Sequence, residues 1–257
     1  MAYVRIGGVE LYSEVAGEGE PVLLLHGGWC SLEYLQAQAD ALVADYRVFA
    51  FERPGHGRSA DVDGDYSYAR MVGDTCAYLD AVGLRDVHVV GFSDGAIIGL
   101  MLALAHPGRV RSLVAISANL DPSAFDLSDV DDDGDGGAPD PERLAYERLS
   151  PDGPGHADVV LEKLFRLWTS EPHIEPDQLA RIAAPVLVMA ADRDTIRPEH
   201  TLRIAASVPG AQLAIVPGTT HGLVRQKPGL VNTLIREFLG SIGAGATRST
   251  GRPPEPS

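Results

Sequence analysis

The stretch Val87-His88-Val89-Val90-Gly91-Phe92-Ser93-Asp94-Gly95 decides the fold of this chain. It begins as an apolar run typical of a strand buried on both faces, and residues 96–105 after it have the composition of a helix. Between the two lies Gly-x-Ser-x-Gly, the pattern of a nucleophile elbow, in which small residues let the backbone turn sharply around an exposed serine. We therefore predict that Ser93 presents its hydroxyl for acyl-transfer chemistry.

Outward from the elbow, short apolar runs alternate with segments of helical period. The prediction depends on this wider pattern, because the elbow pattern alone occurs by chance in roughly one chain in ten of this length. An antiparallel hairpin is predicted at 3–6 and 9–15, buried strands at 22–25, 47–51, 87–92, 110–117, 186–190 and 212–216, and helices at 33–44, 68–82, 96–105, 198–207 and 230–239. Such alternation indicates an α/β fold with a mostly parallel, eight-stranded sheet flanked by helices.

The alternation breaks between residues 120 and 182, where we predict a helical lid inserted before the last two strands. The core would then comprise 1–119 and 183–242. Inside the lid, apolar residues at helical spacing oppose a polar face of Glu162, Lys163 and Arg166; the apolar set is Val159, Val160, Leu164, Phe165, Leu167 and Trp168. Most of these should pack on the core, with Phe165 and Trp168 as candidates to line a substrate pocket. Residues 243–257, rich in Gly, Ser, Thr and Pro, are predicted to be a disordered tail.

The charge balance argues against two classes of partner. The chain carries 36 acidic and 21 basic residues, a formal charge of −15, which repels nucleic-acid phosphates and anionic lipids. It has no signal-peptide core near its start and no apolar run approaching the roughly 20 residues of a membrane span. We expect a cytoplasmic protein with no nucleic-acid or membrane partner, and leave its oligomeric state open. Cys30 and Cys76 are expected to be free thiols.

Two residues that follow predicted strands suit the chemistry of Ser93. A serine hydroxyl needs an imidazole to accept its proton, and the imidazole needs a carboxylate to fix its tautomer. Asp194 follows the strand predicted at 186–190, and His221 follows the strand predicted at 212–216. The carboxyl ends of parallel strands meet at one edge of the sheet, where ligands bind. We therefore predict Ser93 as nucleophile, His221 as base and Asp194 as its orienting acid.

An oxyanion hole requires two backbone N–H groups, and the sequence offers both. The first is that of Asp94, directly after the nucleophile. The second is expected in the loop after 22–25, which reads His26-Gly27-Gly28-Trp29. Gly28 N–H is our first choice; Trp29 is an alternative donor that also suits a wall of the acyl site. His26 is expected to be a structural residue behind this loop.

With these motifs the chain closely resembles the α/β-hydrolase fold family, in its lid-bearing branch of esterases, C–C bond hydrolases, cofactor-free perhydrolases, epoxide hydrolases and haloalkane dehalogenases. The resemblance covers residues 4–239 and rests on these motifs: His26-Gly27-Gly28-Trp29, Arg53-Pro54-Gly55-His56-Gly57-Arg58-Ser59, the elbow, Ala191-Asp192-Arg193-Asp194 with Pro198, and Gly218-Thr219-Thr220-His221. The order Ser, Asp, His agrees with it. Epoxide hydrolases and dehalogenases use a carboxylate nucleophile, so Ser93 argues against both activities.

The resemblance implies a serine hydrolase that cleaves a small carboxylic ester or related acyl substrate through an acyl-enzyme, without cofactor or metal. C–C bond hydrolysis and perhydrolysis by the same triad stay open as alternatives. So does a non-catalytic, ligand-binding member of the fold.

Two positions depart from the family pattern. Ala191 stands where the acid motif usually begins with Gly, so Asp192 competes with Asp194, and Asp121 is an outside candidate for the acid. Asp94 follows the nucleophile where Met, Gln or a bulky residue is common. Its carboxylate either stabilises the next helix through the macrodipole, or favours substrates with a cationic α-amino group near the scissile carbonyl.

An acidic run beginning at Asp129 matches the spacing of a calcium loop that would end at Asp140. Flanking helices with apolar faces are missing, and Asp140 is shorter than the usual Glu. Nine acids and no bases between Asp121 and Glu142 favour a solvated loop instead.

Overall fold

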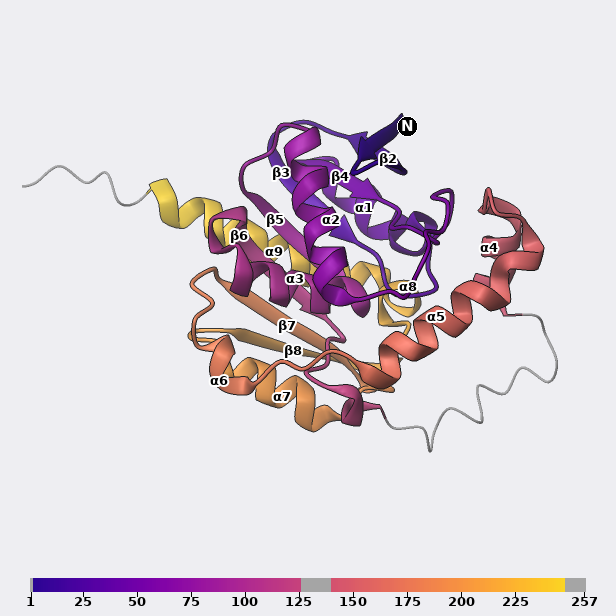
Figure 1. Ribbon diagram of the computed structural model, residues 1–257. Helices are drawn as coiled ribbons and strands as arrows, with labels where there is room; N and C mark the ends of the chain where they lie inside the picture. Colours follow the sequence, from indigo (N-terminus) through magenta and orange to yellow (C-terminus); the bar gives the residue numbers. More distant parts are fainter. Residues whose placement is uncertain (1, 126–139, 248–257) are drawn as a thin grey trace, which may run out of the picture.

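The computed structural model describes residues 2–125 and 140–247. In this part of the chain eight strands form one sheet, in the order β1-β2-β4-β3-β5-β6-β7-β8 (Figure 1). The strands are β1 (Ala2–Ile6), β2 (Val9–Ala16), β3 (Glu20–Leu25), β4 (Tyr46–Phe51), β5 (Val87–Phe92), β6 (Val110–Ile116), β7 (Val186–Arg193) and β8 (Gln212–Thr220). The β1–β2 and β2–β4 pairs are antiparallel and the other pairs parallel. The predicted mostly parallel, eight-stranded sheet is confirmed.

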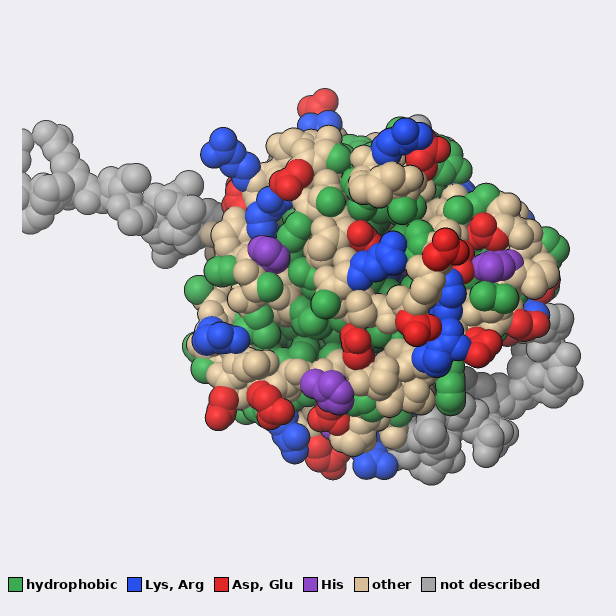
Figure 2. Space-filling model, viewed as in Figure 1, with side chains coloured by type: hydrophobic (Ala, Val, Ile, Leu, Met, Phe, Trp, Pro, Cys, Tyr) green, Lys and Arg blue, Asp and Glu red, His purple; other side chains and the backbone are tan. Residues whose placement is uncertain are grey.

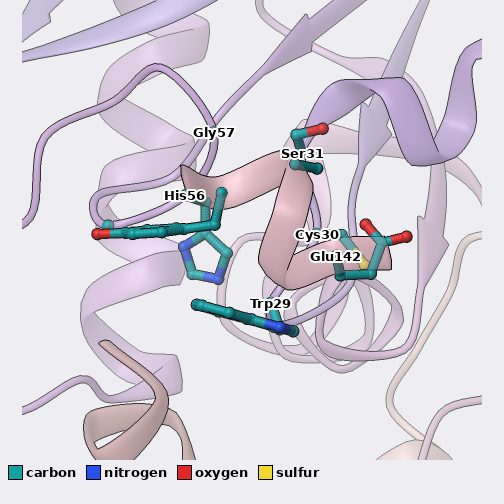
Figure 3. Close-up of a pocket in the computed structure, with 9 residues that line it drawn as sticks. Trp29, Cys30, Ser31, His56, Gly57 and Glu142 are labelled. Atoms are coloured by element: carbon teal, nitrogen blue, oxygen red, sulfur yellow. The ribbon is translucent and has the colours of Figure 1, made fainter. Parts of the chain in front are cut away.

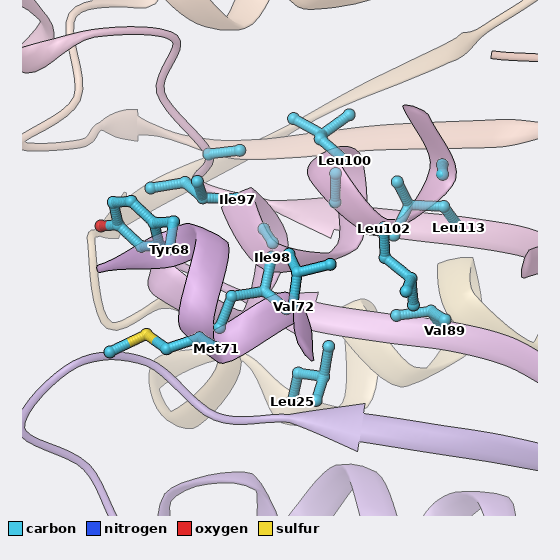
Figure 4. Close-up of a cluster of buried hydrophobic side chains, with 14 of the residues drawn as sticks. Leu25, Tyr68, Met71, Val72, Val89, Ile97, Ile98, Leu100, Leu102 and Leu113 are labelled. Atoms are coloured by element: carbon cyan, nitrogen blue, oxygen red, sulfur yellow. The ribbon is translucent and has the colours of Figure 1, made fainter. Parts of the chain in front are cut away.

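Strand residues alternate between two hydrophobic cores, one on each face of the sheet. In β3, Leu23 and Leu25 belong to one core, and Val22 and Leu24 to the other. Figure 4 shows part of the first core, where side chains of β3, β5 and β6 meet those of α2 (Tyr68–Ala81) and α3 (Asp94–Ala105). A side-chain period of two, apolar at every position, is what a strand covered on both faces requires.

The helices divide between the two faces of the sheet. α2, α3 and α7 (Pro198–Ser207) contribute to the first core. The second core takes residues from α1 (Gln36–Leu42), α8 (Leu223–Gln226) and α9 (Pro228–Thr247). Single 3-10 turns precede α1 and follow α3, as η1 (Leu32–Leu35) and η2 (Pro107–Arg109).

Helix α9 runs to Thr247, so residues 243–247 are helical where the sequence predicts the start of a disordered tail. Extending an existing helix by one residue adds a hydrogen bond without a new nucleus, and Ala favours it, so a packed helix tolerates glycines at its end. Residues 248–257 lie outside the described residues.

Between β6 and β7, the described part of the insertion is helical. It contains η3 (Pro122–Ala124), α4 (Pro141–Leu149), η5 (Pro154–His156), α5 (Ala157–Ser170) and α6 (Pro176–Leu179). Buried side chains of α5, Val160, Leu164 and Leu167, join the first core of the sheet. The insertion therefore packs on the first core through the apolar face of α5.

A buried cluster of charged and polar groups also anchors the insertion. The Asp61 carboxylate, in the loop between β4 and α2, accepts hydrogen bonds from Tyr66 Oη at 2.5 Å, Lys163 Nζ at 2.6 Å and His156 Nε2 at 2.9 Å. The Asp61 and Lys163 side chains are 7% and 11% exposed. Burial alone would raise the pKa of the Asp61 carboxyl, but these hydrogen bonds lower it to about 2.

We expect Asp61→Asn to lower the free energy of unfolding by about 2 kcal/mol at pH 6. The folded pKa lies below that of the unfolded chain. The stabilisation is therefore complete above about pH 4 and is lost as the pH falls toward about 2. Urea unfolding at pH 6 and pH 3 should show the difference between variant and parent shrink at pH 3. Asp65→Asn, which removes an exposed ion pair with Arg166, should lower the free energy of unfolding by less than about 1 kcal/mol. Equal losses of stability in Asp61→Asn and Asp65→Asn would show that the buried cluster around Asp61 does not anchor the insertion.

The surface mixes charges of both signs. Figure 2 shows acidic and basic side chains interspersed across the face viewed in Figure 1. Among residues 2–125 and 140–247, no helix has the length and apolar character needed to cross a membrane.

Candidate active site

Ser93 lies on a strained turn between β5 and α3. Its φ of 53° and ψ of −118° fall in a region that residues with a side chain rarely adopt. The elbow glycines are required by packing. A Cβ on Gly91 would collide with the carbonyl of Gly95, and one on Gly95 with the carbonyl of Leu25. The serine hydroxyl is thereby held at the carboxyl edge of the sheet, above the start of α3.

The structure brings the three predicted catalytic residues together. His221 Nε2 lies 3.1 Å from Ser93 Oγ, and His221 Nδ1 lies 2.7 Å from Asp194 Oδ1. Because a carboxylate only accepts, Nδ1 carries the proton, which leaves the Nε2 lone pair to accept from the serine. The His221 ring also packs at 5.1 Å from the Phe92 ring. This arrangement can move a proton from Ser93 to His221.

Asp194 is well fixed beneath His221. Its Oδ2 accepts from Ser117 Oγ at 2.5 Å and from the Ala191 amide at 3.2 Å, and its Oδ1 accepts from the Ile196 amide at 3.1 Å. Burial alone would raise the pKa of this carboxyl, but the hydrogen bonds from His221, Ser117 and the Ile196 amide hold the pKa below its usual value. Asp194 is therefore poised to remain a carboxylate.

The two competing acids lie elsewhere. Asp192, an exposed residue of β7, accepts from the amides of Gly218 and Thr219 and so ties β7 to the end of β8. Asp121 caps η3 by accepting from Ser123. Neither carboxylate is hydrogen-bonded to His221, whose acid partner is Asp194.

The glycine loop lies directly against the elbow. A Cβ on Gly27 would be 3.3 Å from Ser93 Cβ, and one on Gly28 would be 2.5 Å from Asp94 Oδ2 and 2.6 Å from a ring carbon of Trp168. Only a residue without a side chain fits at Gly28. No described residue accepts a hydrogen bond from the amides of Gly28 or Asp94, so both remain available to a substrate oxygen.

The Asp94 side chain is almost completely buried, at 2% exposure. Its Oδ1 accepts from Tyr68 Oη at 2.8 Å and from Trp168 Nε1 at 3.1 Å. A carboxylate satisfied in this way, at the first residue of α3, fits the structural interpretation better than the recognition of a cationic substrate.

Of the three residues predicted to line the substrate site, Trp168 is hydrogen-bonded to the elbow, through Asp94. Trp29 stacks on Tyr146 with ring centroids 5.0 Å apart, and its Nε1 donates to Asp140 at 3.0 Å. Its indole lines a small cavity with Cys30, His56 and Glu142 (Figure 3). Neither Ser93 nor His221 lines that cavity.

Phe165 is 65% exposed, and no contact brings it to the site. Successive helix residues are rotated by about 100°, so Phe165 lies to one side of the buried stripe formed by Leu164, Leu167 and Lys163. The prediction that Phe165 lines the pocket is not supported by its position.

Three residues of this site were not predicted. Ser117, which donates to Asp194, directly follows β6, and a polar residue after that strand was the available signal. Tyr68, the first residue of α2, reaches the elbow, and Arg53, in the loop after β4, reaches the glycine loop. Nothing in their local sequence indicates those contacts.

Among the described residues, no cluster of three or more His, Cys, Asp or Glu side chains could hold a metal ion. The acidic run considered as a calcium loop lies outside the described residues, except for its last member. That member, Asp140, accepts hydrogen bonds from Trp29 and from the Glu142 amide at the start of α4. It acts there as a helix cap.

Comparison with known proteins agrees with this geometry. The model of the alpha/beta hydrolase family matches residues 22–234. The chain belongs to the alpha/beta hydrolase family. Within it, the chain is 30% identical over 263 residues to RutD of Azorhizobium caulinodans, named as a candidate carbamate hydrolase, and the match covers 94% of this chain and 99% of that protein.

Two other similar proteins differ in their names. A non-heme haloperoxidase of Rhodococcus erythropolis is 27% identical over 268 residues, which cover 91% of this chain and 97% of that protein. A crystal structure of a hydrolase from Pseudomonas aeruginosa superposes with a TM-score of 0.71 at 25% identity, over 93% of this chain and 98% of that one. The chain is therefore an enzyme of the hydrolase class.

Proposed function

We propose that this hydrolase cleaves a small carboxylic ester or related acyl substrate through a covalent acyl-enzyme at Ser93. The observation that carries the proposal is the hydrogen-bonded series from Ser93 Oγ to His221 Nε2, at 3.1 Å, and from His221 Nδ1 to Asp194, at 2.7 Å. A serine, a base within hydrogen-bond reach and a third group that orients the base together characterise activated nucleophiles.

In this mechanism Ser93 attacks the carbonyl carbon while His221 takes the hydroxyl proton. The amides of Gly28 and Asp94 bind the oxygen that becomes negative, and each such donor is typically worth about 3 kcal/mol in the transition state. His221 then gives its proton to the leaving group, which departs. Water attacks the acyl-enzyme with His221 again as base, and Ser93 is restored.

A carbamate is the second candidate substrate. Relatives at 30% to 32% identity carry the carbamate hydrolase name, and a carbamate carbonyl is open to the same serine attack. A substrate with a cationic α-amino group is no longer favoured, because Asp94 is buried and already holds two hydrogen bonds.

A substrate panel tests the proposal. p-Nitrophenyl esters of increasing acyl length, an aminoacyl ester matched to one of them, and a p-nitrophenyl carbamate would be assayed with the parent enzyme and Ser93→Ala. We expect ester turnover that depends on Ser93, and labelling of Ser93 by a fluorophosphonate probe. An unlabelled Ser93 without turnover would instead indicate a ligand-binding protein, and peroxyacid formation exceeding hydrolysis would indicate a perhydrolase.

Trp168→Ala should widen the acyl preference. The indole packs against Gly28 and donates to Asp94, so its removal opens space beside the oxyanion loop. We expect kcat/KM for the octanoyl ester relative to the acetyl ester to rise by about 10-fold, the effect of accommodating roughly one further methylene in an apolar pocket. Phe165→Ala, on the exposed side of the same helix, is the control. A preference unchanged in Trp168→Ala, or changed equally in both variants, would contradict this role.

A further inference from the structure

Arg53 is a completely buried cation directly behind the glycine loop. It follows β4 by two residues and has 0% exposure. Its Nη1 donates to the His26 carbonyl at 2.7 Å, and its Nη2 donates to the Gly27 carbonyl at 2.9 Å. The two arms of the guanidinium thus hold two consecutive peptides of the loop.

His26 strengthens the same hold. Its Nε2 lies 3.2 Å from the Arg53 amide, which can only donate, so the ring proton is on Nδ1. Nδ1 then donates to the Gly27 carbonyl at 2.7 Å. Burial, together with the Arg53 charge, lowers the pKa of His26, which keeps the ring neutral. The Gly27 carbonyl therefore has two donors, one neutral and one charged.

The direction of one carbonyl fixes the direction of the next amide. In a trans peptide, C=O and N–H lie in one plane and point to opposite sides, and the Glu171-Pro172 bond is the sole cis peptide among the described residues. Because the Gly27 carbonyl points to Arg53 in the interior, the Gly28 N–H points to the opposite side. Ser93 and Asp94 lie beside Gly27 and Gly28, and no described residue accepts from the Gly28 amide.

The Arg53 charge also acts through this peptide. Burial lowers the pKa of the guanidinium, and the negative charge of Asp94 is the largest influence that opposes the shift. Arg53 and Asp94 thus carry opposite charges around the glycine loop. A cation bound to the carbonyl polarises the peptide, so its N–H becomes a stronger donor to an oxyanion.

We propose that Arg53 is a positioning residue for the oxyanion hole, which aims and polarises the Gly28 N–H through the Gly27 carbonyl. This inference rests on the proposed function, since it assigns a task within the same acyl transfer. This role also explains why the positive charge of Arg53 is buried with backbone carbonyls as its direct partners. Burying a charge costs desolvation free energy, and packing alone does not require it.

Arg53→Met and Arg53→Lys test the proposal. Methionine keeps much of the length and no charge, whereas lysine keeps the charge but not the two-armed geometry. We expect kcat for the best ester to fall by about 10- to 100-fold in Arg53→Met, less than the loss of a whole donor, with KM within about twofold. The affinity for a boronic acid, whose tetrahedral adduct uses the same hole, should fall by a similar factor. For Arg53→Lys, kcat and the affinity for the boronic acid should lie between the values of the parent and of Arg53→Met.

Arg109 supplies a matched control. Its Nη2 also donates to backbone carbonyls, at 3.2 Å from Leu84 and 3.5 Å from Cys76, at the opposite edge of the sheet. Arg109→Met should lower the melting temperature and leave kcat unchanged. Thionoesters provide a second readout, because sulfur is a poor acceptor. The advantage of the oxoester over the thionoester should shrink in Arg53→Met and persist in Arg109→Met.

The outcomes separate this inference from the proposed function. Ester turnover that survives Ser93→Ala overturns the proposed function, whatever Arg53 does. If turnover depends on Ser93, three results overturn the role of Arg53. The first is an Arg53→Met variant with unchanged kcat and unchanged affinity for the boronic acid, and the second is a loss of kcat in Arg53→Met equal to that in Arg109→Met. The third is failure of both Arg53 variants to fold, which would make Arg53 a support of the fold alone.

Discussion

Ser93→Ala is expected to lower kcat for the best ester by about 10⁴-fold or more, and His221→Ala by a similar factor. Without the hydroxyl there is no nucleophile for His221 to activate, and the remaining rate comes from the oxyanion donors and from substrate binding. Because nucleophile and base act as one unit, the double variant should be no slower than the slower of the two single variants. Single-turnover kinetics with a p-nitrophenyl ester would measure all three.

The fold should tolerate Ser93→Ala. Alanine replaces serine at the same φ of 53°, so the backbone strain stays and the melting temperature should move little. Ser123→Ala, at an exposed position of η3, serves as the matched control and should keep full activity. Retention of more than a tenth of the parent kcat in Ser93→Ala would exclude Ser93 as the nucleophile.

The sheet could be predicted because every central strand has apolar residues on both faces. In β5 all six residues are buried, and such a run carries its own signal. The ends of β7 and β8 could not be predicted in this way. They extend to Arg193 and Thr220 because the Asp192 carboxylate binds the amides of Gly218 and Thr219. Bonds between a side chain and a distant backbone leave no periodic trace in the sequence.

Helix α5 shows how a tertiary ion pair shifts a predicted face. The spacing predicts an apolar stripe that includes Phe165, with Lys163 on the polar side. In the structure Lys163 is buried because Asp61 neutralises it, and Phe165 is exposed. The buried stripe is therefore rotated toward Lys163, and the partner that causes the rotation is about 100 residues away in the chain.

The candidate triad could be predicted because each member follows a strand, and strand ends share one edge of a parallel sheet. The surroundings of Asp94 could not. Tyr68 comes from the start of α2 and Trp168 from the end of α5, and their meeting depends on how the insertion packs. Their contacts favour the structural interpretation of Asp94 over the recognition of a cationic substrate.

Asp194→Asn is the second variant expected to have a large effect, with kcat lowered by about 10³- to 10⁴-fold. If the new amide nitrogen faces His221, the imidazole must carry its proton on Nε2 and cannot accept from Ser93. If the nitrogen faces the other way, it meets the Ala191 amide, a second donor, and His221 still loses the negative charge that stabilises its protonated form. Either orientation impairs proton transfer.

Two other acids of the chain make this test specific. The Gly218 and Thr219 amides bind different oxygens of Asp192, so Asp192→Asn keeps an acceptor for one of them and should lower kcat by less than about 10-fold. Asp121→Asn should leave kcat almost unchanged, since Asp121 caps η3. If either control lost as much activity as Asp194→Asn, the acid that orients His221 would have to be reassigned, although the 2.7 Å contact between His221 and Asp194 argues that neither will.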